Sequence, residues 1–191
     1  MRQDNSSTIK SIRKTQKKLP LLKAKSSKKA VVVKAKRKVS IFDLLKRDHT
    51  EIQKLCKKVL EGKVSTSEQI HDTFNSLKGI VLSHNKAVGS IFYNEVLEAS
   101  QAKQDLKGHQ RVLKGFEEHR IAGMLINEMS QIGVEDERFM AKMNVLSETL
   151  LNNIKNEELS IFKTARKVLD NEVRGKLAKQ FVQEKKKNVS H

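Results

Sequence analysis

A chain of 191 residues suits one domain with a tail, and a domain of this size can bury a core without disulfide or metal staples. The single Cys56 excludes an internal disulfide, while few aromatic residues, one Pro and many Lys, Glu, Leu and Ile favour helices over strands, so we predict an all-α fold. The net charge of +17 would indicate a basic nucleic-acid-binding domain, but residues 1–39 carry +13 of it and residues 40–191 only +4.

Residues 1–39 are the first predicted region, a basic tail that we expect to be disordered in isolation. They hold 14 Lys or Arg against one acidic residue, Asp4, and have little apolar matter to bury. Three interpretations stay open. The tail is a solubilising arm, a segment that binds nucleic acid or another polyanion without sequence preference by releasing counterions, or a transit peptide, although Lys outnumbers Arg in it.

The next region, residues 40–170, begins with two helix-capping patterns. Ser40 and Asp43 have the capping-box spacing for a helix over about 41–61, which Gly62 should end. Ser65 and Glu68 repeat the spacing, so we predict that Ser65 caps a second helix that runs to about residue 100.

Two more long helices are predicted over about 110–131 and 136–169. Four long amphipathic helices with short connections indicate an antiparallel up-down-up-down four-helix bundle. Asp170 is a plausible N-cap for the last region, residues 171–191, which reads as a short amphipathic C-terminal helix followed by a basic end.

Each of the first three long helices has one histidine on its predicted core-facing stripe. Steps of three and four residues place His49, His84 and His119 on these stripes, while the stripe of the fourth helix includes Asn153 and Glu157. The apolar or small members of the four stripes are Ile41, Leu45, Ile52, Cys56 and Val59; Leu77, Val81, Val88 and Ile91; Val112, Phe116, Gly123 and Ile126; and Leu146, Leu150 and Ile161.

Three imidazoles and one carboxylate at a common level need a shared partner, because an unpaired buried polar group costs roughly 1–3 kcal/mol. That partner is another member of the set, water, or a metal ion such as iron, zinc, manganese or copper. His49, His84, His119 and Glu157 are therefore the candidate metal ligands. His71 and His109 lie too far along their helices to reach the same level.

The four predicted helices resemble the hemerythrin-like (HHE cation-binding) domain family. The segments that carry the resemblance are "DLLKRDHTEI", "LSHNKAVGSIFYNEV", "FEEHRIAGMLINEM" and "AKMNVLSETLLNNIKNEELSIFKTARKVL", and together they span about residues 40–187. The resemblance implies a four-helix bundle around a non-haem di-iron centre that carries or senses dioxygen, responds to nitric oxide, or handles iron. It also implies ligand roles for His49, His84, His119 and Glu157.

Several positions depart from the family pattern. Val88 and Gly89 stand where the second helix should supply carboxylates, Asn153 stands where the fourth should supply a histidine, and Asn94 replaces a proline. Three neutral imidazoles and one carboxylate are too few for two dications, so we do not expect an intact di-iron centre. Nearby Asp48, Glu118, Glu158 or the amide oxygen of Asn153 are possible further ligands, although helix geometry turns most of them away from the core.

Two functions of different classes follow. The first is a hemerythrin-like protein that binds one non-haem iron or other divalent metal in a degenerate site, for small-ligand sensing, oxygen or nitric oxide response, or iron handling. The alternative is a metal-free bundle in which Asn153 hydrogen-bonds His119 or Glu157, serving as an interaction module whose tail, residues 1–39, binds nucleic acid or another polyanion.

Other classes have less support. No Ser/His/Asp or Cys/His arrangement and no phosphate-binding glycine loop is present, so we expect no enzymatic activity. No apolar run approaches the roughly 18 residues of a membrane span, and we expect a cytoplasmic protein in which Cys56 is a buried, reduced side chain. The oligomeric state stays open.

Overall fold

The computed structural model describes residues 39–187, and every regular element within them is helical, which confirms the all-α prediction for this range. Residues 1–38, which hold nearly all of the predicted basic tail, and residues 188–191 lie outside the described range. Within residues 39–187, no helix is both long enough and apolar enough to cross a membrane.

Nine helical segments follow one another along the described part of the chain. They are α1 (Ile41–Leu60), α2 (Ser67–Ala87), η1 (Val88–Tyr93), α3 (Asn94–Ala102), α4 (Leu106–Ser130), α5 (Glu137–Asn156), η2 (Glu157–Ile161), α6 (Phe162–Val168) and α7 (Asn171–Lys187). The π-helical segments η1 and η2 have right-handed helical backbone at both ends. They therefore join α2 to α3 and α5 to α6 in two long continuous helices, as the sequence analysis predicted, but with a π-helical turn inside each.

The start of α1 follows the sequence prediction, while the start of α2 differs by one residue. Ser40 Oγ accepts from the Asp43 backbone N–H at 3.1 Å and the Asp43 carboxylate accepts from the Ser40 N–H at 3.2 Å, which completes the predicted capping box. The predicted Ser65 cap is wrong. Thr66 caps α2, because its hydroxyl accepts from the Gln69 N–H at 3.2 Å.

The later helix starts show one further difference. α4 begins at Leu106, about one turn before the predicted residue 110, because Asp105 caps it through a 3.0 Å bond from the Gly108 N–H. The cap predicted at Asp170 is confirmed by a 2.8 Å bond from the Val173 N–H to its carboxylate.

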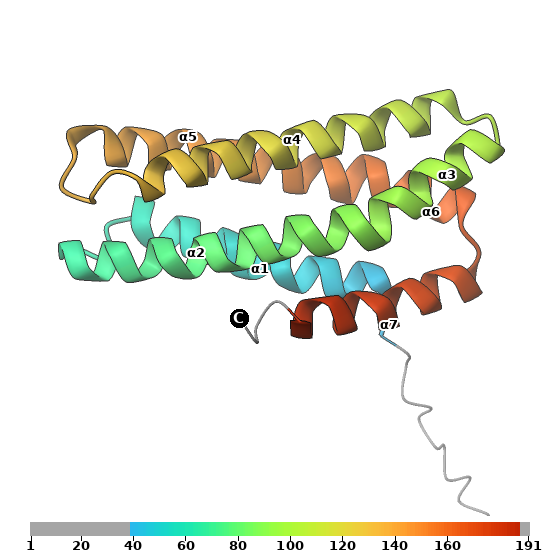
Figure 1. The fold of residues 1–191 in the computed structure, drawn as a ribbon, viewed down its shortest axis with the longest axis horizontal. Coiled ribbons are helices and arrows are strands. Elements are labelled where there is room, and N and C mark those ends of the chain that lie inside the picture. Colours follow the sequence, from blue (N-terminus) through green and yellow to red (C-terminus); the bar gives the residue numbers. More distant parts are fainter. Residues whose placement is uncertain (1–38, 188–191) are drawn as a thin grey trace, which may run out of the picture. The chain divides into compact units, whose positions relative to one another are not determined.

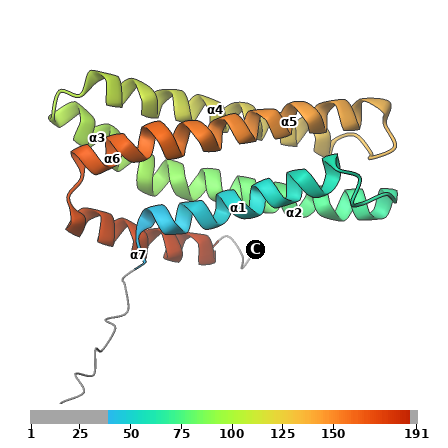
Figure 2. The same ribbon diagram turned by 180° about the vertical axis from the view of Figure 1, so that it is seen from behind.

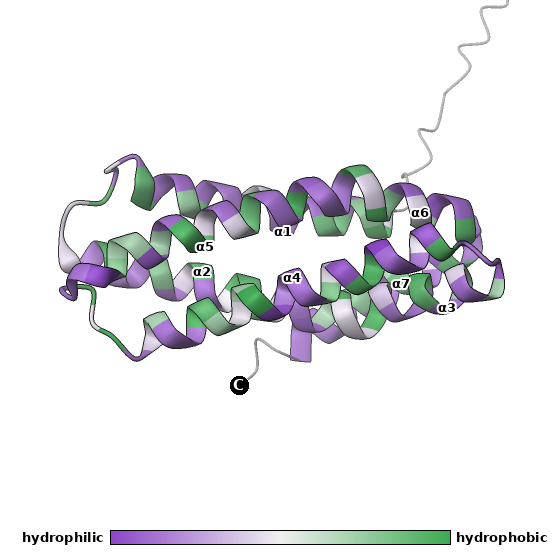
Figure 3. Cartoon of the chain, turned by 90° about the horizontal axis from the view of Figure 1, so that it is seen from above, coloured by the Kyte–Doolittle hydropathy of each residue, from purple (hydrophilic) through white to green (hydrophobic). Residues whose placement is uncertain are grey.

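The long helices pack side by side within this part of the chain (Figures 1 and 2). α1 packs along α2, and α4 packs along α5; α4 also contacts α2, and α5 contacts α1. α7 returns along α1 and contacts α2 and η1 as well. In Figure 3 apolar and polar residues alternate along each helix, as expected when one stripe of each faces the interior.

The buried interior consists of two apolar clusters. The first cluster contains Ile41, Phe42, Leu45, Ala87, Val88, Phe92, Tyr93, Val96, Val112, Ile161, Phe162, Ala165, Val168, Leu169, Leu177, Ala178 and Phe181. The second cluster contains Ile52, Leu55, Cys56, Val59, Val64, Phe74, Leu77, Val81, Ala122, Ile126, Met129, Phe139, Met143, Leu146, Leu150 and Ile154. Cys56 is buried, as predicted.

A buried polar layer, defined here as His49, His84, His119 and Glu157, lies between the two apolar clusters along the length of the helices. On each of the four long helices the polar residue falls between members of the first cluster on one side and members of the second on the other. All four side chains are buried, so the predicted inward orientation is correct. The layer is the only place in the described range where buried histidines gather.

Candidate metal centre

Three members of the polar layer converge on one point. His49 Nε2 lies 3.0 Å from Glu157 Oε2, and His84 Nε2 lies 3.7 Å from the same oxygen. One ligand atom from each of the three residues falls within 4.8 Å of the others. The three side chains come from α1, α2 and η2, so the cluster depends on the packing of helices distant in sequence.

Two further carboxylates fix the orientation of the imidazole rings. His49 Nδ1 lies 2.8 Å from Glu158 Oε1, and His84 Nδ1 lies 3.1 Å from Asp48 Oδ2. A carboxylate accepts hydrogen bonds, so each Nδ1 carries the hydrogen and donates it. Each ring therefore directs its other nitrogen, Nε2, toward Glu157. This is the arrangement in which a carboxylate orients a metal-ligating histidine.

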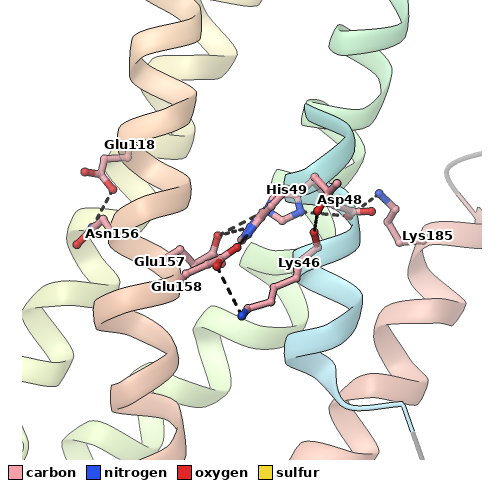
Figure 4. Close-up of polar contacts among 10 residues, drawn as sticks. Lys46, Asp48, His49, Glu118, Asn156, Glu157, Glu158 and Lys185 are labelled. Atoms are coloured by element: carbon pink, nitrogen blue, oxygen red, sulfur yellow. Dashed lines mark hydrogen bonds and ion pairs between the residues drawn. The ribbon is translucent and has the colours of Figure 1, made fainter. Parts of the chain in front are cut away.

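Lysines offset the charge of these two orienting carboxylates (Figure 4). Lys185 on α7 donates to Asp48 Oδ2 at 2.9 Å, the same oxygen that accepts from His84. Lys46 on α1 lies 3.7 Å from Glu158 Oε2. Both lysines approach from the solvent side, which leaves the inner faces of the imidazoles to Glu157.

The pKa values of the cluster favour an ionised carboxylate between the imidazoles. Burial raises the pKa of Glu157, but the hydrogen bonds from His49 and His84 outweigh it and hold that pKa well below its ordinary value. Burial also lowers the pKa of His84, yet the hydrogen bonds to Asp48 and Glu157 reverse the effect and raise it. Glu157 is therefore a negatively charged oxygen donor in an apolar surrounding.

His119, the fourth residue predicted for the site, lies beside the cluster rather than in it. Its ring is edge-on to His84 with centroids 5.7 Å apart, and stacks on Tyr93 at 5.0 Å. Neither ring nitrogen has a hydrogen-bond partner in the described part of the chain. Burial, opposed by the charge of Glu157, lowers the pKa of His119 to about 4, so the ring is a neutral imidazole at neutral pH.

Several buried polar atoms around the layer have no hydrogen-bond partner within residues 39–187. They are both ring nitrogens of His119, Glu157 Oε1, Asn153 Oδ1 and the Tyr93 hydroxyl. The hydrogen bond between Asn153 and His119 that was one expectation for a metal-free core is therefore not made. Groups of this kind carry a cost unless something polar satisfies them, and a cation at the common point suits the Glu157 carboxylate. The residues present therefore fit one metal ion.

The same residues do not fit two metal ions. Val88, at the position where the resemblance implies a bridging carboxylate, is fully buried and belongs to the first apolar cluster. Among the described residues, two imidazoles and one carboxylate reach the common point, which leaves too little negative charge for a second dication.

Both π-helical segments adjoin the site. Glu157 is the first residue of η2, and η1 begins at Val88, one turn after His84. π-Helical turns are rare and occur frequently at functional sites, because the extra residue in the turn re-aims the side chains. Here η2 places Glu157 inside the core and the next residue, Glu158, at its edge, so that both contact His49.

Sequence reasoning placed Asp48 and Glu158 among residues mostly turned away from the core. The structure shows both half-buried and bonded to the histidines through Nδ1. Lys185 was not singled out at all. The sequence signal for Asp48 and Glu158 was that each lies directly next to a candidate ligand, His49 and Glu157 respectively. Adjacent residues of a helix point in different directions, so one can reach the cluster while the other contacts a histidine of a neighbouring helix.

The sequence matches no family model and no curated protein, and the structure matches no solved structure. The resemblance to the hemerythrin-like family therefore stays a prediction.

Proposed function

We propose that the chain is a hemerythrin-like four-helix-bundle protein that binds one non-haem iron or other divalent metal ion through His49, His84 and Glu157. The observation that carries the proposal is the convergence of two Nε2 atoms on one carboxylate oxygen while two separate carboxylates hold both Nδ1 atoms. Metal-ligating histidines commonly donate their other ring N–H to a carboxylate in this way.

The donor set favours iron among the candidate metals. Two histidines and one carboxylate are typical of non-haem Fe(II) sites that leave coordination positions open, and imidazole also suits zinc and copper. Bound iron would supply a Lewis-acidic centre at which a small ligand such as dioxygen or nitric oxide can bind. His119 and Tyr93 stack on each other beside the cluster, and both side chains are buried.

A metal held by His49 would take the place of one contact of its ring. The Nε2 atom lies 3.0 Å from Glu157 Oε2, and the Nδ1 atom lies 2.8 Å from Glu158 Oε1. A metal at Nε2 would replace the first contact, while Nδ1 would keep its bond to Glu158.

The role is binding and sensing or iron handling rather than turnover. The two carboxylates beside the cluster, Glu158 and Asp48, are engaged with the histidines and with lysines. They orient ligands instead of facing the point where a small molecule would bind.

Metal analysis of protein purified without chelator tests the proposal. We expect about one equivalent of iron or zinc per chain, and a content below about a tenth of an equivalent after iron loading would contradict it. The variants His49→Ala and Glu157→Gln are expected to lose the metal. His71→Ala is the matched control, because His71 is an exposed histidine on α2.

The orienting carboxylates give a more sensitive test. Asp48→Asn leaves the three ligands in place but weakens the acceptor for His84 Nδ1–H, so we expect Co²⁺ affinity to fall about 10–100-fold by optical titration. The same exchange at exposed Asp72 on α2 should leave the affinity unchanged. Equal affinities of both variants would mean that Asp48 has no role in metal binding.

A protein that proves metal-free would favour the alternative function, an interaction module whose basic tail binds nucleic acid or another polyanion. Binding by the tail should weaken steeply with salt and disappear on deletion of residues 1–39. Unchanged affinity after that deletion would contradict the alternative.

A further inference from the structure

A groove between α1 and α7 combines apolar walls with cations. Leu44 on α1 and Phe181 and Val182 on α7 supply the apolar lining, and the groove encloses about 600 Å³. This is within the range of about 300–1,000 Å³ that small-molecule sites usually occupy. The groove lies on the solvent side of the metal centre rather than in it.

The charge of the groove favours an anion. Arg47 and Lys185 line it, and the one acidic residue in the lining, Asp48, already pairs with Lys185 at 2.9 Å. Lys185 also lies 6.0 Å from the centre of the Phe181 ring, so a cation and an apolar wall are adjacent. A ligand with a carboxylate head and a hydrocarbon chain can satisfy both at once.

Asp48 links this groove to the polar layer. Its Oδ2 atom accepts from Lys185 on the groove side and from His84 on the core side. A carboxylate that binds Lys185 in the groove would draw this lysine from Asp48. Asp48 would then accept more strongly from His84 Nδ1–H, and a more strongly held Nδ1–H makes Nε2 a better metal ligand.

We propose that the groove between α1 and α7 binds an aliphatic carboxylate, held by Arg47 and Lys185 at its head and by Leu44, Phe181 and Val182 along its chain, and that this ligand tightens metal binding at His84. The binding itself needs no metal, whereas the link to His84 rests on the proposed function.

Calorimetric titration of the full-length, chelator-treated chain with dodecanoate tests the binding. We expect one saturable site per chain, with Arg47→Ala weakening the affinity about tenfold through loss of a charge-assisted contact. Lys54→Ala is the matched control, because Lys54 is an exposed cation on the same helix that pairs with Glu51 and does not line the groove.

Ligand controls separate this site from the basic tail, which attracts any anion. Acetate has the head without the chain, and dodecyltrimethylammonium has the chain with the opposite charge; neither should compete with dodecanoate. Equal losses in Arg47→Ala and Lys54→Ala, or no saturable binding, would overturn the proposal.

The link to the metal centre is read from Co²⁺ affinity with and without saturating dodecanoate. A tightening of about threefold or more supports the link, and by reciprocity Co²⁺ should tighten dodecanoate binding by the same factor. An unchanged Co²⁺ affinity would overturn the link. If the chain binds no Co²⁺ at all, the proposed function fails, while the titration of metal-free protein still decides whether the groove is a carboxylate site.

Discussion

Gly115 on α4 lies where the helices approach closely beside the candidate metal centre. A Cβ atom at this position would lie 2.8 Å from Ile161 Cδ1 and 2.8 Å from the Tyr93 hydroxyl. Both distances are too short for ordinary contact, and both neighbours are fully buried. The absence of a side chain therefore lets Tyr93 and η2 pack against α4 next to the polar layer.

The variant Gly115→Ala should destabilise the protein by about 1–3 kcal/mol, because the added methyl forces buried neighbours apart. Gly123→Ala is the control on the same helix, where a Cβ meets nothing within 4 Å. That exchange should stabilise by about 0.5–1 kcal/mol through helix propensity. Urea denaturation of both variants measures the difference, and a stabilising Gly115→Ala would contradict the close approach.

At the scale of elements, the start of α2 distinguishes two neighbouring hydroxyl residues. Thr66 Oγ1 accepts from the Gln69 N–H, while Ser65 contributes only its backbone N–H, to the Gln69 side chain. Thr66→Ala should therefore cost about 1 kcal/mol of unfolding free energy. Ser65→Ala should stay within about 0.5 kcal/mol of the wild type. Chemical denaturation of the two variants checks the assignment, which a larger loss at Ser65 would reverse.

Most helix limits could be predicted from local signals, because capping residues and the apolar period act within a few residues. The start of α4 was missed since Gly108 has low helix propensity. Its backbone N–H nevertheless bonds to Asp105, and a Cβ there would lie 2.6 Å from Thr164 Cγ2, so this glycine serves packing rather than a break. The π-helical turns were not predicted, because one extra residue in a turn hardly changes the apolar pattern.

For the candidate site, the sequence predicts which face of its helix each residue occupies, but not which residues meet across helices. Periodicity placed His49, His84 and Glu157 in the interior, and each is buried. Which of them meet depends on the rotation and offset of whole helices, so His119 was predicted as a ligand although it lies beside the cluster. The bond of Asp48 to Lys185 joins residues 137 positions apart, for which no local pattern exists.

For the whole molecule, the polar layer makes stability depend on pH when no metal is bound. The pKa of His119 is about 4 in the fold and about 6.5 in the unfolded chain, because burial penalises the charged ring. Below pH 6.5 the unfolded chain therefore binds a proton at His119 that the folded protein does not bind. The free energy of unfolding consequently falls as the pH drops from 6.5 toward 4. His84 has the opposite sign. Its raised pKa contributes stability that is present below 6.5 and is lost as the pH rises through the folded value.

The variant His119→Leu isolates the first of these effects. Between pH 6.5 and 4.5 the wild-type protein should lose about 2 kcal/mol more unfolding free energy than the variant, because leucine has no proton to gain. Urea denaturation in the presence of chelator at both pH values measures the difference. Contributions from Asp48 and Glu157, whose pKa values are lowered, are common to both proteins. Equal losses in the two proteins would show that folding does not lower the pKa of His119.

The polar layer lies between two apolar clusters, and this position also limits how far each long helix can shift along the axes of its neighbours. A shift of a helix by one turn, about 5.4 Å, would still place apolar side chains against apolar side chains on either side of the layer. The same shift would strand the Glu157 charge among aliphatic side chains, which is far more costly. The layer thus specifies the register of the helices along their axes, as a single buried asparagine does in a coiled coil. Insertions of a full turn should be tolerated in the connecting loops but not within the helices between the layer and either cluster.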